Sequence, residues 1–198
     1  TVIAIECIDE IAKLAGVGEQ VAEVTAKAMR GEIAFNDSLT HRVACLEGVP
    51  VSHLNQIRDS IPIMPGIQAL LTHLKQYNWK LAIASGGFTF FADHLKARLG
   101  LDFAISNTLA VKNEQLTGKV EGEIVNADVK ARTVNALAEK WQISAKQTVA
   151  MGDGANDLVM MAESALGVAC HGKPLVNEKA DVAIRIGSLH SLLYFLDK

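Results

Sequence analysis

The sequence predicts an α/β protein with a doubly wound, mostly parallel sheet and a small unit of four helices. From about residue 63 onward, short buried strands alternate with amphipathic helices, which is typical of a Rossmann-like sheet covered on both faces. Between residues 6 and 61 apolar residues recur only at helical spacing. We therefore expect a short leading segment at residues 1–3, a helical domain at 4–62 and an α/β core domain at 63–198.

Bulk properties exclude several classes of function. The 198 residues carry a net charge of -3 without a basic run, which argues against nucleic acid or an anionic membrane surface as a partner. No stretch reaches the roughly 18 apolar residues of a membrane span. The three cysteines are odd in number and far apart, as expected for thiols of a reducing compartment, so we expect a cytoplasmic protein. These properties indicate no oligomeric state.

The elements of the helical domain follow from apolar spacing and from glycine or proline breaks. We expect helices near residues 8–15, 21–29, 37–46 and 51–61, with short loops that favour antiparallel neighbours.

The elements of the core domain are predicted in the same way, from apolar spacing and from glycine and proline residues that end helices and strands. Helices are expected at 66–76, 89–99, 128–141 (with Asp128 as N-cap), after Asp157, and at 189–196; strands at 81–84, 103–106, 148–151, 166–169 and 182–184; and an antiparallel ribbon at 109–125.

An acidic loop, residues 152–157, follows the buried strand 148–151 and precedes a helix. Asp153 therefore stands at the carboxyl end of a strand, where open α/β sheets bind ligands. Asn156 and Asp157 stand where helix caps are favoured, so a simple capped turn also explains the pattern. Two carboxylates and an amide in five residues exceed what capping requires, and carboxylates with phosphate oxygens and water suit Mg²⁺.

Two other segments have chemistry suited to anions. Ser85, Gly86 and Gly87 follow a strand and precede a helix, so a hydroxyl and backbone N–H groups are available to bind phosphate. Lys130 lies in the first turn of its helix, where a cation is unfavourable unless an anion is near. When each feature is taken alone, a glycine-rich turn and a solvated surface lysine are the simpler explanations.

The helical domain contains two charged candidates. Arg42 suits bidentate recognition of a carboxylate, and Glu6 suits an ammonium group. Without further context, an ordinary surface charge is the better explanation of each.

The order of these pieces matches a known family. The segments 85–88 (Ser-Gly-Gly-Phe), Lys130 and 152–157 (Gly-Asp-Gly-Ala-Asn-Asp) resemble the second, third and fourth motifs of the haloacid dehalogenase-like phosphatases. The helical segments around Glu6, Ala28 to Gly31, Phe35, Ser38-Leu39 and Arg42-Val43 are similar to those of phosphoserine phosphatases, and the likeness covers nearly all of the chain. The acidic loop alone is shared with ion pumps and sugar phosphatases. Only its combination with the helical segments points specifically to the phosphoserine phosphatases.

The resemblance implies a Mg²⁺-dependent hydrolysis of phosphoserine to serine through an aspartyl-phosphate, the last step of serine biosynthesis. It implies that Asp153 binds Mg²⁺, with Asp157 as a further ligand or as the residue that orients it. Lys130, the Ser85 hydroxyl, the backbone of Gly86 and Gly87, and Asn156 would bind the phosphoryl group. Glu6 would face the substrate ammonium and Arg42 its carboxylate, while Met29 and Phe35 would line an apolar cap that excludes water. No further small-molecule, nucleic-acid or membrane partner is implied.

One departure separates the chain from the family pattern. The resemblance makes residues 1–3 the end of the first catalytic motif, with Thr1 as its last conserved position. It places the nucleophile and the general acid on two aspartates, four and two positions before Thr1, at the end of a central first strand that the sequence does not include. We expect a longer parent chain to supply this strand. Two other functions remain open at this point: transfer of the phosphoryl group to an alcohol other than water, and a catalytically inactive module that senses an amino acid.

Overall fold

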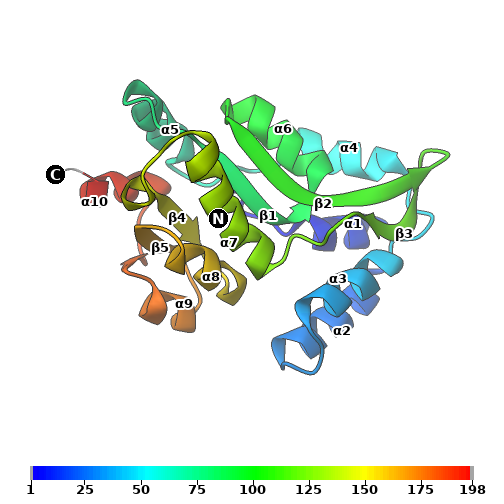
Figure 1. Ribbon diagram of the computed structural model, residues 1–198. Helices are drawn as coiled ribbons and strands as arrows, with labels where there is room; N and C mark the ends of the chain where they lie inside the picture. The colour runs from blue at the N-terminus through cyan, green and yellow to red at the C-terminus, as the bar shows by residue number, and fades with distance from the viewer. Residues whose placement is uncertain (1, 197–198) are drawn as a thin grey trace. The chain divides into compact units, whose positions relative to one another are not determined.

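The computed structural model describes residues 2–196 (Figure 1). Thr1, which we expect to end the first catalytic motif, lies outside the described residues. The described chain forms two compact units: a C-terminal unit of residues 2–4, 63–81 and 125–196, and a helix–hairpin unit of residues 5–62 and 82–124. The division into helical and core domains at residue 62 stays a prediction.

The C-terminal unit is built on a parallel sheet of β4 (Val149–Gly152), β5 (Leu166–Cys170) and β6 (Val182–Ile184), in that order. Val168 and Ala169 of β5 are completely buried, as expected for the middle strand of a covered parallel sheet. Its helical elements are α5 (Ile67–Gln76), α7 (Ala127–Lys140), η1 (Ala145–Gln147), η2 (Ala155–Asp157), α8 (Leu158–Ala162), α9 (Pro174–Lys179), η3 (Leu189–Leu192) and α10 (Leu193–Leu196). Helix α8 packs on β4 and β5, and α7 packs on α8. The turn between β4 and α8 is therefore held from several sides.

The helix–hairpin unit contains α1 (Cys7–Leu14), α2 (Gly18–Met29), α3 (Phe35–Ala44), α4 (Val51–Asp59), β1 (Ala82–Phe88), α6 (Thr89–Leu99), β2 (Phe103–Lys112) and β3 (Gln115–Glu121). Strand β2 pairs in parallel with β1 and then forms an antiparallel hairpin with β3, and Figure 1 shows it as the long green arrow. The hairpin turns at Asn113 and Glu114, whose φ angles are both positive. Helices α1 to α4 bury an apolar core that includes Ile11, Val21 and Leu39.

The predicted fold class is confirmed, since helices alternate with mainly parallel strands and four helices precede them. The predicted single sheet, however, is present among residues 2–196 as two three-stranded sheets, with β1 ending one and β4 ending the other. The central strand that we expect upstream stays a prediction.

Several element boundaries were wrong for local reasons. The strand at 81–84 continues to Phe88 and contains Ser85, Gly86 and Gly87, and the strand at 103–106 continues without a break into the hairpin. Asn126, not Asp128, caps α7, because its side chain accepts the Val129 N–H at 3.1 Å. Helix α9 was missed, and the segment 189–196 begins as a 3₁₀ turn.

Candidate active site

The acidic loop is organised by the side chain of Asp157. Its Oδ2 accepts the backbone N–H groups of Asp153 and Gly154, both at 3.1 Å. A β-carbon on Gly152 would lie 2.3 Å from Cβ of Asp157, and one on Gly154 would lie 2.5 Å from Oδ1 of Asn156. The two glycines are therefore required because the loop folds back on its own polar side chains.

Lys130 forms the second contact of Asp157. Its Nζ lies 2.8 Å from Oδ1 of Asp157, and the two residues are only 5% and 8% exposed. The interpretation of Lys130 as a solvated surface residue is therefore wrong. A buried ammonium needs a close anion, because desolvation of an unpaired charge costs several kcal/mol. Helix α7 thus places a buried positive charge, the Lys130 ammonium, next to the Asp157 carboxylate of the acidic loop.

Asp153 lies half-buried at the end of β4. Its backbone carbonyl accepts the N–H of Lys173 at 3.1 Å, which ties the loop to the start of α9. Burial and, to a smaller extent, the nearby Asp153 carboxylate raise the pKa of the Cys170 thiol to about 11. Asp153 therefore stands beside the carboxyl end of β5 as well as β4, at the edge where the sequence predicts a ligand.

Ser85, Gly86 and Gly87 belong to the helix–hairpin unit. Oγ of Ser85 accepts the N–H of Gly87 at 3.1 Å. The backbone carbonyls of all three residues accept hydrogen bonds from two buried side chains of β2, Ser106 and Asn107. Sequence reasoning missed these two residues, although consecutive polar residues inside an otherwise apolar strand are the pattern that could have identified them.

Two of the predicted substrate-binding residues of the helical segment, Arg42 and Glu6, carry opposite charges that interact. Burial lowers the pKa of Arg42, while the carboxylates of Asp9 and Glu6 act in the opposite direction. Nε of Arg42 donates to the Ser38 carbonyl at 3.3 Å, which leaves the terminal nitrogens of the guanidinium for other acceptors. The structure thus places Arg42 within the electrostatic reach of two acidic groups.

The predicted apolar residues of this segment differ in exposure. Met29, the last residue of α2, is 70% exposed, and Phe35, the first residue of α3, is half-buried. An exposed methionine of this size is available for an apolar contact. The convergence of the candidates of the two units on one substrate stays a prediction.

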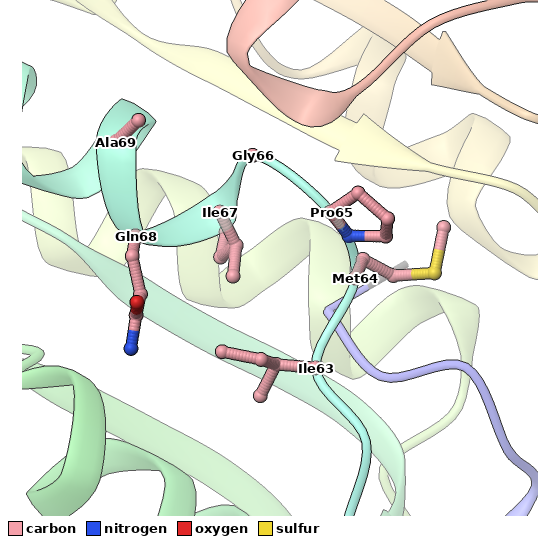
Figure 2. Close-up of a pocket in the computed structure, with 7 residues that line it drawn as sticks. All are labelled: Ile63, Met64, Pro65, Gly66, Ile67, Gln68 and Ala69. Carbon is pink, nitrogen blue, oxygen red and sulfur yellow. The ribbon is translucent and has the colours of Figure 1, made fainter.

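A pocket of about 350 Å³ is lined by none of these residues. It is formed by the loop before α5 and the first turn of that helix, residues 63–69 (Figure 2). Its lining residues are apolar in type apart from Gln68.

The described residues offer carboxylates for a metal but not a complete set of ligands. No group of three His, Cys, Asp or Glu side chains is placed to hold a metal ion within residues 2–196. Both oxygens of Asp157 are already used, by Lys130 and by two N–H groups. Over the same residues, no helix has both the length and the apolar character needed to cross a membrane.

A model of the haloacid dehalogenase-like hydrolases matches residues 2–164. The chain belongs to this family. It is 53% identical over 196 residues to the phosphoserine phosphatase of Vibrio cholerae. The aligned region covers 99% of this chain and 60% of that protein. It is 47% identical over 193 residues to the phosphoserine phosphatase of Idiomarina loihiensis. Here the aligned region covers 98% of this chain and 88% of that protein.

Solved structures agree with the sequence comparison. A structure described as a phospho-aspartyl intermediate analogue of phosphoserine phosphatase matches with a TM-score of 0.92 at 37% identity, covering 98% of this chain and 93% of that one. The chain spans about three-fifths of the length of the Vibrio cholerae relative.

Proposed function

We propose that this chain is the major part of a Mg²⁺-dependent phosphoserine phosphatase, which hydrolyses O-phospho-L-serine to L-serine and phosphate in the cytoplasm as the last step of serine biosynthesis. The observation that carries the proposal is the buried Lys130–Asp157 pair, whose carboxylate also accepts the backbone N–H groups of Asp153 and Gly154. The relatives named phosphoserine phosphatase support the choice of substrate.

The fixed charges suit phosphoryl transfer. This reaction depends mainly on positioning and on electrostatic cover for the phosphoryl oxygens. Lys130 is held by Asp157 before any substrate arrives, so its positive charge costs no reorganisation during the reaction. The Ser85 hydroxyl, the N–H of Gly86 and the amide of Asn156 would donate to the remaining oxygens, while the N–H of Gly87 orients the Ser85 hydroxyl.

The nucleophile in this proposal is a carboxylate of the preceding segment, as the family resemblance implies. Its attack on phosphorus forms an aspartyl-phosphate and releases serine, and water then hydrolyses the acyl phosphate. The second upstream aspartate would protonate the leaving serine oxygen and then take a proton from the attacking water.

Mg²⁺ fits the donors that this chain supplies. The ion prefers one or two carboxylates together with phosphate oxygens and water, and the family resemblance assigns the Asp153 carboxylate to it. Asp157 already accepts hydrogen bonds on both of its oxygens. When bound, the ion would neutralise negative charge between the phosphoryl group and the attacking carboxylate. Asp157 would then act by holding the Asp153 backbone and Lys130 in place.

Recognition of the amino-acid part would belong to the helical segment. Arg42 suits the substrate carboxylate, because a guanidinium binds it through two parallel hydrogen bonds. Glu6, which is exposed and lies just before α1, would face the ammonium group. Met29 and Phe35 would exclude water when the substrate is bound.

The test is phosphate release from O-phospho-L-serine by the full-length protein, with and without Mg²⁺. Asp153→Asn should lower the rate by about 100-fold or more, because a neutral amide is a poor Mg²⁺ ligand. Asp93→Asn is the matched control, since Asp93 is exposed on α6 and outside the proposed site. Intact protein that binds phosphoserine but releases no phosphate would overturn the proposal. Transfer of the phosphoryl group to an added alcohol in preference to water would point to a phosphotransferase instead.

A further inference from the structure

Strand β1 carries an irregularity at Ser85, Gly86 and Gly87. Ala84 pairs with Ile105 and Phe88 pairs with Asn107, so three residues of β1 stand opposite one residue of β2. Extra residues of this kind form a bulge, whose carbonyl groups lose their regular partners in the ladder. Buried carbonyls without partners are costly, so something must replace those hydrogen bonds.

Two side chains of β2 replace them. Oγ of Ser106 donates to the Ser85 carbonyl at 3.0 Å, and Nδ2 of Asn107 donates to the carbonyls of Gly86 at 2.8 Å and Gly87 at 3.1 Å. Asn107 is completely buried, and Ser106 is 8% exposed. All three carbonyls of the bulge are therefore held from the β2 side by residues that are themselves shielded from solvent.

Holding these carbonyls also sets the direction of the N–H groups. The peptide bonds of the described residues are all trans, so each C=O and the N–H that follows it point to opposite sides of the chain. Because Ser106 holds the Ser85 carbonyl, the N–H of Gly86 points away from Ser106. The same contact of Asn107 on Gly86 turns the N–H of Gly87 toward Oγ of Ser85, where it donates at 3.1 Å.

The Ser85 hydroxyl is oriented as a result. A hydroxyl that accepts one hydrogen bond can still donate its own proton to another acceptor. Glycine at position 87 permits this contact, because a β-carbon there would lie only 3.2 Å from Oγ of Ser85. The bulge therefore offers two donors of fixed direction, the Ser85 O–H and the Gly86 N–H.

We propose that Ser106 and Asn107 are positioning residues that hold the 85–87 bulge in the form that binds a phosphoryl group. The inference rests on the proposed function, because that function assigns the Ser85 and Gly86 donors to phosphate. Neither residue touches the anion in this account. Both act on its affinity through the backbone carbonyls of the bulge.

The experiment measures inhibition and binding by inorganic phosphate in the full-length protein carrying Ser106→Ala. We expect the dissociation constant of phosphate to rise about 10-fold, the equivalent of one well-aligned hydrogen bond. The dissociation constant of L-serine should stay within about two-fold, because Ser106 acts on the phosphate donors alone. Ser106→Thr keeps the hydroxyl and should restore phosphate binding.

A matched control separates this effect from a general loss of a strand hydrogen bond. Thr117 of β3 also donates its hydroxyl to a strand carbonyl, that of Ala110, at 3.2 Å. Thr117→Val should leave phosphate binding unchanged. Asn107→Ala is the second variant at the bulge, and it should weaken phosphate more than Ser106→Ala does because it frees two carbonyls.

The outcomes distinguish this inference from the proposed function. Unchanged phosphate binding in Ser106→Ala would overturn the inference, as would an equal loss of phosphate and serine affinity. Wild-type protein that binds phosphate but does not hydrolyse phosphoserine would contradict the proposed substrate, while the effect of Ser106→Ala on phosphate would still support the positioning role. Wild-type protein that binds no phosphate would overturn both.

Discussion

Charged side chains are held differently in the two units. In the C-terminal unit, Lys130 and Asp157 form a 2.8 Å pair whose side chains are 6% and 11% exposed. In the helix–hairpin unit, pairs such as Glu23–Lys27 join neighbours on a helix surface, with side chains 71% and 44% exposed. A buried pair that also binds backbone cannot move without exposing an uncompensated charge, whereas a surface pair is screened and easily exchanged. The first arrangement is suited to catalysis, which needs charges fixed in advance.

The largest expected effect comes from breaking the buried pair. Lys130→Met removes the cation and leaves the Asp157 carboxylate buried without its partner, so the free energy of unfolding should fall by about 3–5 kcal/mol. Urea denaturation measures this change. Lys27→Met, which removes a surface cation, is the matched control and should leave the denaturation midpoint unchanged. Equal midpoints for the two variants would contradict the contrast between the units.

The next effect concerns the space inside the acidic loop. Gly152→Ala would place a β-carbon 2.3 Å from Cβ of Asp157, and overpacking of this kind costs about 1–3 kcal/mol. Phosphate release should fall with it, because the carboxylate that holds Lys130 would be displaced. Gly18→Ala at the start of α2 meets its nearest atom only at 3.8 Å and should leave both stability and activity intact. Full activity in Gly152→Ala would show that the loop tolerates a different conformation.

A smaller effect should appear at alkaline pH. Burial raises the pKa of the Cys170 thiol from 9.0 to about 11. The protonated thiol is favoured in the folded state, so its contribution to stability is complete below pH 9 and is lost as the pH rises through 11. Cys170→Ala should therefore reduce the fall of unfolding free energy with pH in this window by about 1.4 kcal/mol per pH unit. The unfolding free energy is measured by chemical denaturation between pH 9 and 11. If its slope against pH is the same in the wild type and in Cys170→Ala, the Cys170 thiol has an ordinary pKa in the folded protein and the prediction is wrong.

The smallest effect is expected at a surface pair. The hydrogen bond from Lys27 lowers the pKa of Glu23, but both side chains face water. Glu23→Gln should therefore leave the thermal midpoint unchanged at physiological salt. A clear loss of stability would mean that the helix surface depends on its charges more than the exposure of these residues indicates.

Sequence patterns were sufficient for features that depend on local chemistry. Helical spacing of apolar residues predicted all four early helices, and the glycine-flanked carboxylates predicted a polar turn after β4. They were insufficient where distant segments decide the outcome. The burial of Lys130 depends on Asp157, a residue 27 positions away, and the extension of β1 through Gly87 depends on side chains of β2. Asn126 replaced Asp128 as the cap of α7 because both are good caps and only the register of the helix chooses between them.

The most direct test of the account is a Mg²⁺ titration of phosphate release from phosphoserine in the full-length protein and two variants. If Asp153 binds the ion and Asp157 holds Lys130 and the loop, Asp153→Asn should raise the Mg²⁺ concentration for half-maximal rate by about 10-fold or more. Asp157→Asn should instead lower kcat with a smaller change in that concentration. The reverse pattern, in which Asp157→Asn alone weakens the response to Mg²⁺, would contradict the assignment of these two carboxylates.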